Sequence, residues 1–143
     1  MARRRYPHPA TPARSRIMRS IRASGTAPEA EVRSRLHRAG LRFRKNATLR
    51  LPSGSTRPDI VFPRLKLAVF IDGCFWHGCP RHATHPRHNA WYWAPKLRQN
   101  RDRDARSTRE LRSAGWLVRR FWEHVPPARV AQQVQALVQR LVD

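Results

Sequence analysis

The pattern of apolar and polar residues predicts three helices. Residues 26–39 open with a Thr-x-x-Glu capping box and continue with apolar residues at helical spacing before a glycine. Residues 95–114 form a polar segment with a thin apolar edge, which begins at a proline and stops at a glycine. Residues 126–141 begin with two prolines and predict an amphipathic helix. Its apolar face is expected to consist of Val130, Val134, Leu137, Val138 and Leu141.

Short apolar runs between these helices predict the strands of a sheet. Asp59–Phe62 and Leu67–Ile71 are joined by a short link, which is typical of a buried hairpin. Leu41–Lys45 alternates apolar and basic residues, and Trp116–Phe121 predicts a further strand. Residues 47–58 contain proline and glycine and are expected to form turns. The order α-β-β-β-α-β-α predicts an α/β fold, with helices packed against a mixed sheet.

The charge of the chain indicates its partner. Its 143 residues include 30 Lys and Arg against 9 Asp and Glu, which gives a formal charge of +21. A polyanion neutralises such an excess, and arginine, the dominant basic residue, binds phosphate bidentately, so we expect nucleic acid. The length suits one domain, expected at residues 26–143 after a basic flexible arm at 1–25. No membrane span or signal peptide is evident, so a cytoplasmic location is expected.

Two aspartates lie at the ends of the predicted hairpin strands. Asp59 opens the first strand and Asp72 closes the second, so antiparallel pairing would bring both carboxylates to one edge of the sheet. A carboxylate pair beside phosphate-binding arginines suits Mg²⁺, which takes oxygen ligands and stabilises charge on a scissile phosphate. Two turn-forming aspartates without a metal fit the pattern equally well.

Two cysteines and several histidines follow Asp72 at short intervals in the sequence. Tetrahedral Zn²⁺ takes four such ligands, and a histidine that follows the last strand can return to the cluster. The spacing favours a structural zinc site over two inert reduced cysteines or a disulfide. The expected ligands are Cys74, Cys79, His82 and His124, with His85 or His88 as a replacement for His82.

Phe75 and Trp76 lie within this cluster. A large aromatic pair on a constrained loop can insert between base pairs, although such a pair is more often part of a core. Its position between Cys74 and His77 favours insertion into a duplex.

Five sequence blocks, taken together and in order, resemble the Vsr-type endonucleases of very-short-patch mismatch repair. The blocks are residues 14–21, 57–62, 69–77, 96–104 and 115–123, and the resemblance extends over about residues 14–142. It implies a restriction-endonuclease-like core of the PD-(D/E)xK type with a structural zinc site. It also implies Mg²⁺-dependent nicking of double-stranded DNA on the 5′ side of the thymine in a T·G mismatch.

The resemblance implies roles for individual residues. Asp59 corresponds to the metal-binding aspartate and His77 to the catalytic histidine, whose ordinary pKa of about 6.5 suits a general base. Mg²⁺ would be bound by Asp59, Asp72 and the backbone carbonyl of Ile71. Asp72 is a departure, because some relatives carry histidine there. Glu29 corresponds to an acidic residue tied to the active site, and a role in the capping box alone is the equal alternative.

The resemblance also implies contacts with DNA. Apolar side chains would enter the duplex beside the mismatch, where unstacking costs less than at a matched step. The residues expected to contact DNA or to lie beside the active site are Arg14, Arg16, Met18, Arg19, Phe75, Trp76, Asn100 and Asp104.

Two other functions fit the residues. The chain could be a zinc-stabilised nucleic-acid-binding module in which Asp59 and Asp72 are only structural, or a related nuclease of the same core with another specificity. Other repair proteins are further candidate partners, and a monomer suffices for cutting one strand.

Overall fold

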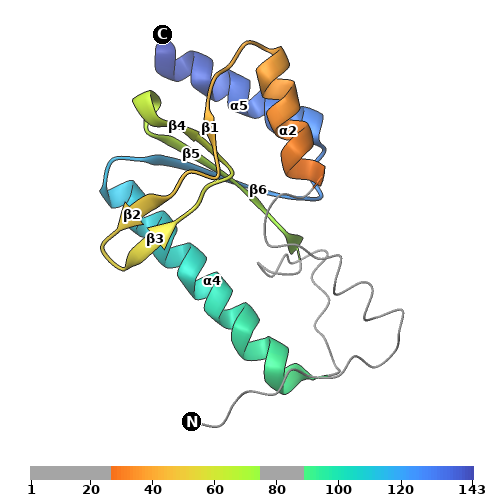
Figure 1. Cartoon of the computed structure of the whole chain (residues 1–143), viewed down its shortest axis with the longest axis vertical. Helices are drawn as coiled ribbons and strands as arrows, with labels where there is room; N and C mark the ends of the chain where they lie inside the picture. Colours follow the sequence, from red (N-terminus) through yellow and green to blue (C-terminus); the bar gives the residue numbers. More distant parts are fainter. Residues whose placement is uncertain (1–26, 75–88) are drawn as a thin grey trace.

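A four-stranded mixed sheet forms the centre of the computed structural model, which describes residues 27–74 and 89–143 (Figure 1). The strand order is β1-β4-β5-β6, and β2 and β3 form a separate hairpin. The described helices are α2 (Ala27–Arg38), α4 (Ala90–Ser113) and α5 (Pro127–Val142), with a 3-10 turn, η1, at Pro63–Leu65. The strands are β1 (Arg44–Lys45), β2 (Leu49–Leu51), β3 (Gly54–Thr56), β4 (Ile60–Phe62), β5 (Leu67–Asp72) and β6 (Leu117–Trp122).

Strand β5 pairs with a neighbouring strand on each of its sides. It pairs antiparallel with β4, with Ile60 opposite Val69, which confirms the predicted hairpin. On its other side it pairs with β6 in parallel over its whole length, so that Asp72 lies opposite Trp122. A parallel pair needs a crossover connection, and α4 lies within this one. All six residues of β5 are buried, as expected of a strand covered on both faces.

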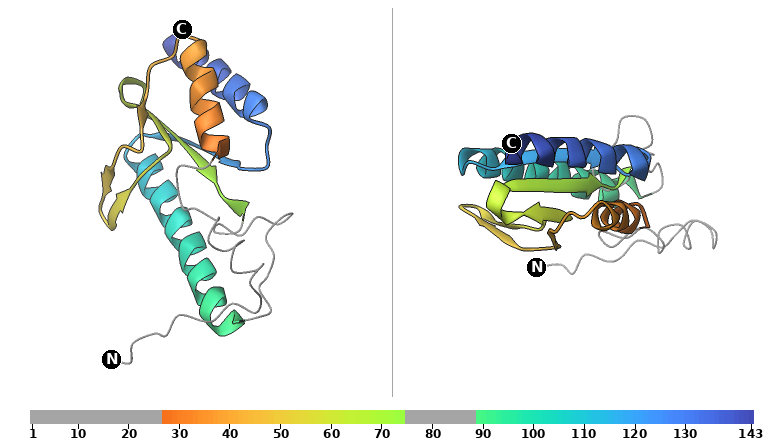
Figure 2. Two further views of the ribbon diagram at one scale, coloured as in Figure 1. Left: turned by 45° about the vertical axis from the view of Figure 1, so that its right-hand side comes forward. Right: turned by 90° about the horizontal axis from the view of Figure 1, so that it is seen from above.

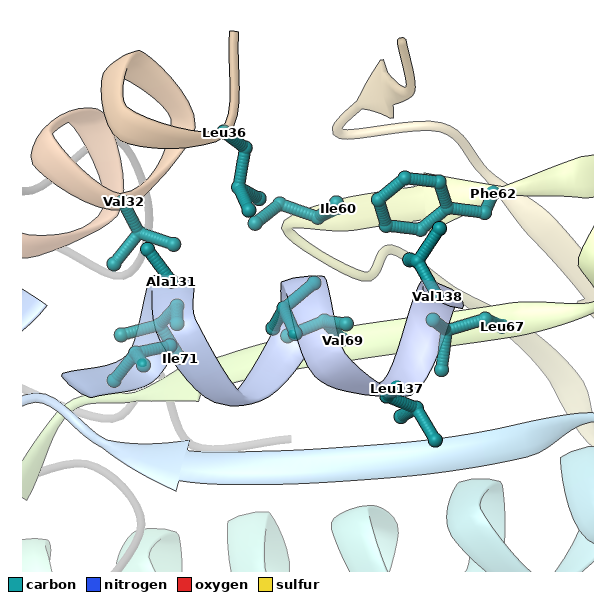
Figure 3. Packing of buried hydrophobic residues seen from close by; sticks show 12 residues of the cluster. Val32, Leu36, Ile60, Phe62, Leu67, Val69, Ile71, Ala131, Leu137 and Val138 are labelled. Carbon is teal, nitrogen blue, oxygen red and sulfur yellow. The ribbon is translucent and has the colours of Figure 1, made fainter. Parts of the chain in front are cut away.

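One face of the sheet packs against α2 and α5. Alternate residues of β5, namely Leu67, Val69 and Ile71, contribute to this core, since successive side chains of a strand point to opposite faces. Figure 3 shows Val32 and Leu36 of α2 approaching the same core. The predicted apolar face of α5 is confirmed for four of its five residues: Val130, Val134, Leu137 and Val138.

The opposite face of the sheet packs against α4. Ala68 and Phe70 of β5 form a second, smaller core with Leu111 of α4 and Val118 of β6. By the same alternation, Asp72 lies on this face, beside α4. The N-terminal turns of α4 extend beyond the sheet (Figure 2).

Two strand predictions need correction. Leu41–Lys45 was expected to be a strand, but only Arg44–Lys45 pairs with β4, and Leu41 and Phe43 instead pack against the core formed with α2 and α5. Residues 47–58 were expected to be turns, but they contain the β2–β3 hairpin. Leu49 and Leu51 pack against the second core, and their burial stabilises the two strands. The proline and glycine residues nearby favour turns, so the sequence pattern did not indicate these strands.

Two helix predictions also need correction. The second helix was expected to begin at Pro95, yet α4 begins at Ala90 and contains that proline. Tyr92 and Trp93 are buried and hold the earlier turns, and this packing offsets the one backbone donor that proline lacks. Leu141 was expected in the core but is 40% exposed, because it lies one turn beyond the last core contact of α5. No helix in the described ranges has both the length and the apolarity needed to cross a bilayer.

Candidate functional site

Three of the nine acidic residues lie close together in the interior. Glu29 belongs to the first turn of α2, Asp59 precedes β4, and Asp72 ends β5. Their exposed fractions are only 2%, 8% and 7%, respectively. The carboxyl of Asp59 is hydrogen-bonded to that of Glu29 and lies within the electrostatic field of Asp72. The antiparallel β4–β5 pair thus brings the two aspartates together at one edge of the sheet, as the sequence predicts, and α2 adds the glutamate.

Burial gives Asp59 an unusual affinity for a proton. Desolvation of its carboxylate is the largest cause, and the charge and hydrogen bond of Glu29 and the charge of Asp72 act in the same direction. The amide of Ile71 opposes them, since it donates a 2.6 Å hydrogen bond to Asp59 Oδ2. Together these effects raise the pKa of Asp59 from 3.8 to about 7. Asp59 therefore keeps its proton up to about neutral pH.

Asp72 has a cationic partner in Arg120 of β6. The Nη1 atom of Arg120 donates to Oδ1 and Oδ2 of Asp72 at 3.0 Å and 3.2 Å. Its Nε donates to Thr108 Oγ1 of α4 at 2.8 Å, and its guanidinium lies 3.9 Å from the centroid of the Phe70 ring. Arg120 therefore neutralises Asp72 and ties α4 to the end of β5.

The site continues along α4. A cavity of about 230 Å³ lies beside Asp72 and Arg120 and is also lined by Arg101, Asp104 and Trp122. The backbone carbonyl of Asp104 lies 3.4 Å from Arg120 Nη2, so this predicted residue is adjacent to the carboxylate cluster. Asn100 lies one turn earlier on α4 and is half-buried.

Cys74 and His124 lie next to each other after the ends of β5 and β6. Cys74 Sγ is 3.4 Å from His124 Nδ1, and the amide of Cys74 donates to Glu123 Oε1 at 3.0 Å. Two of the four expected zinc ligands are thus adjacent, held there by the parallel pairing of the two strands. The other two, Cys79 and His82, lie outside the described residues.

The donor chemistry of both clusters can be compared with their expected metals. Within residues 27–74 and 89–143, no three His, Cys, Asp or Glu side chains are arranged as a complete metal site. Buried carboxylates are nevertheless the donors that Mg²⁺ prefers, and a thiol beside an imidazole is a donor pair for Zn²⁺. The residues present fit each metal by donor type, with Asp72 held by Arg120 in the described arrangement.

Comparison with known proteins decides the family. Residues 9–82 match the family described as DNA mismatch endonuclease Vsr. The chain belongs to the Vsr family. The resemblance predicted from its sequence blocks is confirmed, and this Vsr-family chain is a DNA endonuclease, a hydrolase of phosphodiester bonds.

Relatives of this Vsr-family chain include proteins named as nicking enzymes and as a mismatch endonuclease. The type II nicking enzyme V.NaeI of Lentzea aerocolonigenes is 50% identical over 139 residues, 96% of this chain and 80% of the relative. The type II nicking enzyme V.XorIIP of Xanthomonas oryzae pv. oryzae is 43% identical over 109 residues, 75% of this chain and 76% of the relative. The DNA mismatch endonuclease Vsr of Escherichia coli K12 is 34% identical over 133 residues, 90% of this chain and 80% of the relative.

Sequence reasoning missed Arg120 and Thr108. Arg120 lies in a strand that was predicted, and parallel pairing with β5 would have placed it two positions from Asp72. The orientation of that pairing could not be inferred, and 27% of the chain is charged, so one arginine gives no signal. Several predicted site residues lie outside the described part of the chain: Arg14, Arg16, Met18, Arg19, Phe75, Trp76, His77, Cys79 and His82.

Proposed function

We propose that this Vsr-family endonuclease nicks duplex DNA on the 5′ side of the thymine in T·G mismatches, in a reaction that depends on Mg²⁺. The observation that supports a hydrolytic site is the buried cluster of Glu29, Asp59 and Asp72. Three such groups are costly to bury in a chain with nine acids, and they are retained at the end of two adjacent strands. The name of the Escherichia coli relative supports mismatched DNA as the substrate.

In this proposal Asp59, Asp72 and the Ile71 carbonyl hold Mg²⁺, which stabilises negative charge on the scissile phosphate when bound. Glu29 positions Asp59 through their hydrogen bond. His77 accepts or shuttles a proton, and it lies three residues after Cys74 in the sequence. The arrangement of two carboxylates on adjacent antiparallel strands supports a core of the restriction-endonuclease type.

We also propose that Zn²⁺ joins Cys74 and His124 to Cys79 and His82. The 3.4 Å approach of Cys74 Sγ and His124 Nδ1 supports this part of the proposal. The metal would fix the start of the segment that contains Phe75, Trp76 and His77, the residues to which this proposal assigns insertion and proton transfer. The basic arm at residues 1–25, which includes Met18, would also contact the duplex.

A cleavage assay with two matched duplexes tests this function. One labelled duplex contains T·G and the other T·A, and each is incubated with Mg²⁺ or with EDTA. We expect metal-dependent nicking of one strand of the T·G duplex alone. Equal cutting of both duplexes would refute mismatch specificity, and binding without cleavage at every Mg²⁺ concentration would favour a non-catalytic module.

Substitution of Asp59 tests the assignment of the site. Asp59→Ala is expected to abolish nicking while leaving DNA affinity within a few-fold of wild type, because an acidic side chain supplies no cationic contact to the DNA phosphates. Asp102→Ala is the matched control, since Asp102 is an exposed acid of α4. Substantial activity in Asp59→Ala would exclude Asp59 from metal binding.

A further inference from the structure

The C-terminal half of α4 contains a basic groove that the proposed active site does not use. An open cavity of about 700 Å³ lies between this half of the helix and Arg120 of β6. We name it the arginine groove; its lining includes Asp104, Thr108, Arg109, Arg112, Ser113 and Arg120. Arginines therefore outnumber acids on its surface by three to one.

Two of these arginines are available for a ligand. Arg109 and Arg112 are exposed, and none of the ion pairs found among the described residues involves either of them. They are three residues apart on α4, so their side chains share one face of the helix. Thr108 and Ser113 add hydroxyl groups to the same surface. Paired guanidinium groups and hydroxyls in a hollow are the donors that bind phosphate oxygens.

The arginine groove is continuous with the carboxylate cluster. The smaller cavity beside Asp72 shares two lining residues, Asp104 and Arg120, with the groove. From Arg101 in the smaller cavity to Arg112, α4 rises about 16 Å. At about 3.4 Å per nucleotide, that distance corresponds to roughly five nucleotides along one strand.

We propose that the arginine groove binds the phosphate backbone of the DNA strand that leaves the active site. Arg109 and Arg112 grip phosphates a few nucleotides from the scissile bond, and they contact no bases. The ligand class is thus the nucleic-acid phosphodiester, held by charge and independent of the mismatch. This inference rests on the proposed function only for the location of the scissile phosphate.

Salt dependence of DNA binding tests the groove. The affinity of wild type and Arg109→Gln/Arg112→Gln for T·G and T·A duplexes is measured by fluorescence anisotropy in EDTA between 50 and 300 mM NaCl. Each lost phosphate contact lowers the slope of log affinity against log salt by about 0.9, so the double variant should lose about 1.8. At 0.1 M salt this corresponds to an affinity loss of about 60-fold, equal for the two duplexes.

Two further variants separate the groove from net charge. Arg129→Gln/Arg140→Gln removes the same charge from exposed positions of α5, which covers the opposite face of the sheet. For this α5 variant, the slope of log affinity against log salt should stay within about 0.3 of the wild-type slope. The Arg109→Lys/Arg112→Lys variant keeps both charges, so it should retain most of the wild-type slope. Equal slopes for the α4 and α5 glutamine pairs would overturn the groove. A loss confined to the T·G duplex would overturn it too, because it would indicate recognition of the mismatch.

The salt-dependence test of the arginine groove gives a result whether or not the protein cleaves DNA. If the wild type nicks nothing, the proposed function fails while the slopes still decide the groove. If it nicks T·G duplexes and the slopes are unaffected, only the groove fails. Thermal unfolding followed by circular dichroism confirms that each variant is folded, and exposed arginines on helix surfaces are expected to tolerate these changes.

Discussion

Replacing Asp59 with asparagine should remove a pH-dependent cost of folding. Asparagine has nearly the same shape and keeps a carbonyl oxygen for the amide of Ile71, but it cannot ionise. In the wild type the pKa of Asp59 is raised from 3.8 to about 7, first by burial and then by Glu29 and Asp72. Since one pKa unit corresponds to about 1.36 kcal/mol, ionising Asp59 in the folded protein costs about 4 kcal/mol.

The sign of the effect follows from proton binding. Between pH 3.8 and about 7 the folded wild type keeps the Asp59 proton, whereas the unfolded chain loses it. The folded state therefore binds more protons, and the free energy of unfolding falls as pH rises through this window. Above about pH 7 both states are ionised and the contribution of Asp59 becomes constant. Asp59→Asn lacks this fall, so its stability relative to wild type should rise by up to about 4 kcal/mol across the window.

Urea unfolding at intervals from pH 4 to pH 8.5 measures the difference. Titrating groups outside the carboxylate cluster are common to both proteins, so their contributions to the free energy of unfolding cancel in the comparison. Asp102→Asn, at an exposed position of α4, is the control and should follow wild type at every pH. If the stability difference between Asp59→Asn and wild type does not change with pH, the carboxyl of Asp59 is not held in its protonated form in the folded protein.

Two further predictions concern the partners of the site. Cys74→Ser should remove bound zinc, measured by metal analysis, and lower the Tm by about 10 °C, because structural zinc contributes directly to folding; purified wild type without zinc would contradict this. Arg120→Ala should lower the free energy of unfolding by about 2 kcal/mol, since it removes the guanidinium that forms an ion pair with the buried carboxylate of Asp72, and Arg120→Lys should lose less. Equal urea midpoints for Arg120→Ala and wild type would mean that the ion pair adds nothing to stability.

The parts of the fold that sequence predicts are those in which local and tertiary signals agree. The β4–β5 hairpin has short apolar runs and a short link, and the predicted apolar face of α5 is buried in the core as far as Val138. The convergence of Asp59 and Asp72 followed because antiparallel pairing fixes which strand ends meet. The α2 helix was predicted as well, and Glu29 proved to serve the acidic cluster as well as the first turn of the helix.

The parts that sequence misses depend on contacts between distant segments. The β2–β3 hairpin is held by Leu49 and Leu51 on the second core, which no local pattern reveals. The early start of α4 depends on the burial of Tyr92 and Trp93, and propensity alone places a helix start at Pro95. Arg120 reaches Asp72 across 48 residues, through a strand pairing whose parallel direction only the structure determines.

The charge balance of the carboxylate cluster connects the observed arrangement to the proposed metal. Three ionised carboxylates in one buried cluster repel one another, and Arg120 forms an ion pair with one of them, Asp72. Burial makes the fully ionised state costly, and the proton held by Asp59 removes one of the three negative charges. A proton and Mg²⁺ would thus compete for the carboxyl oxygens of Asp59.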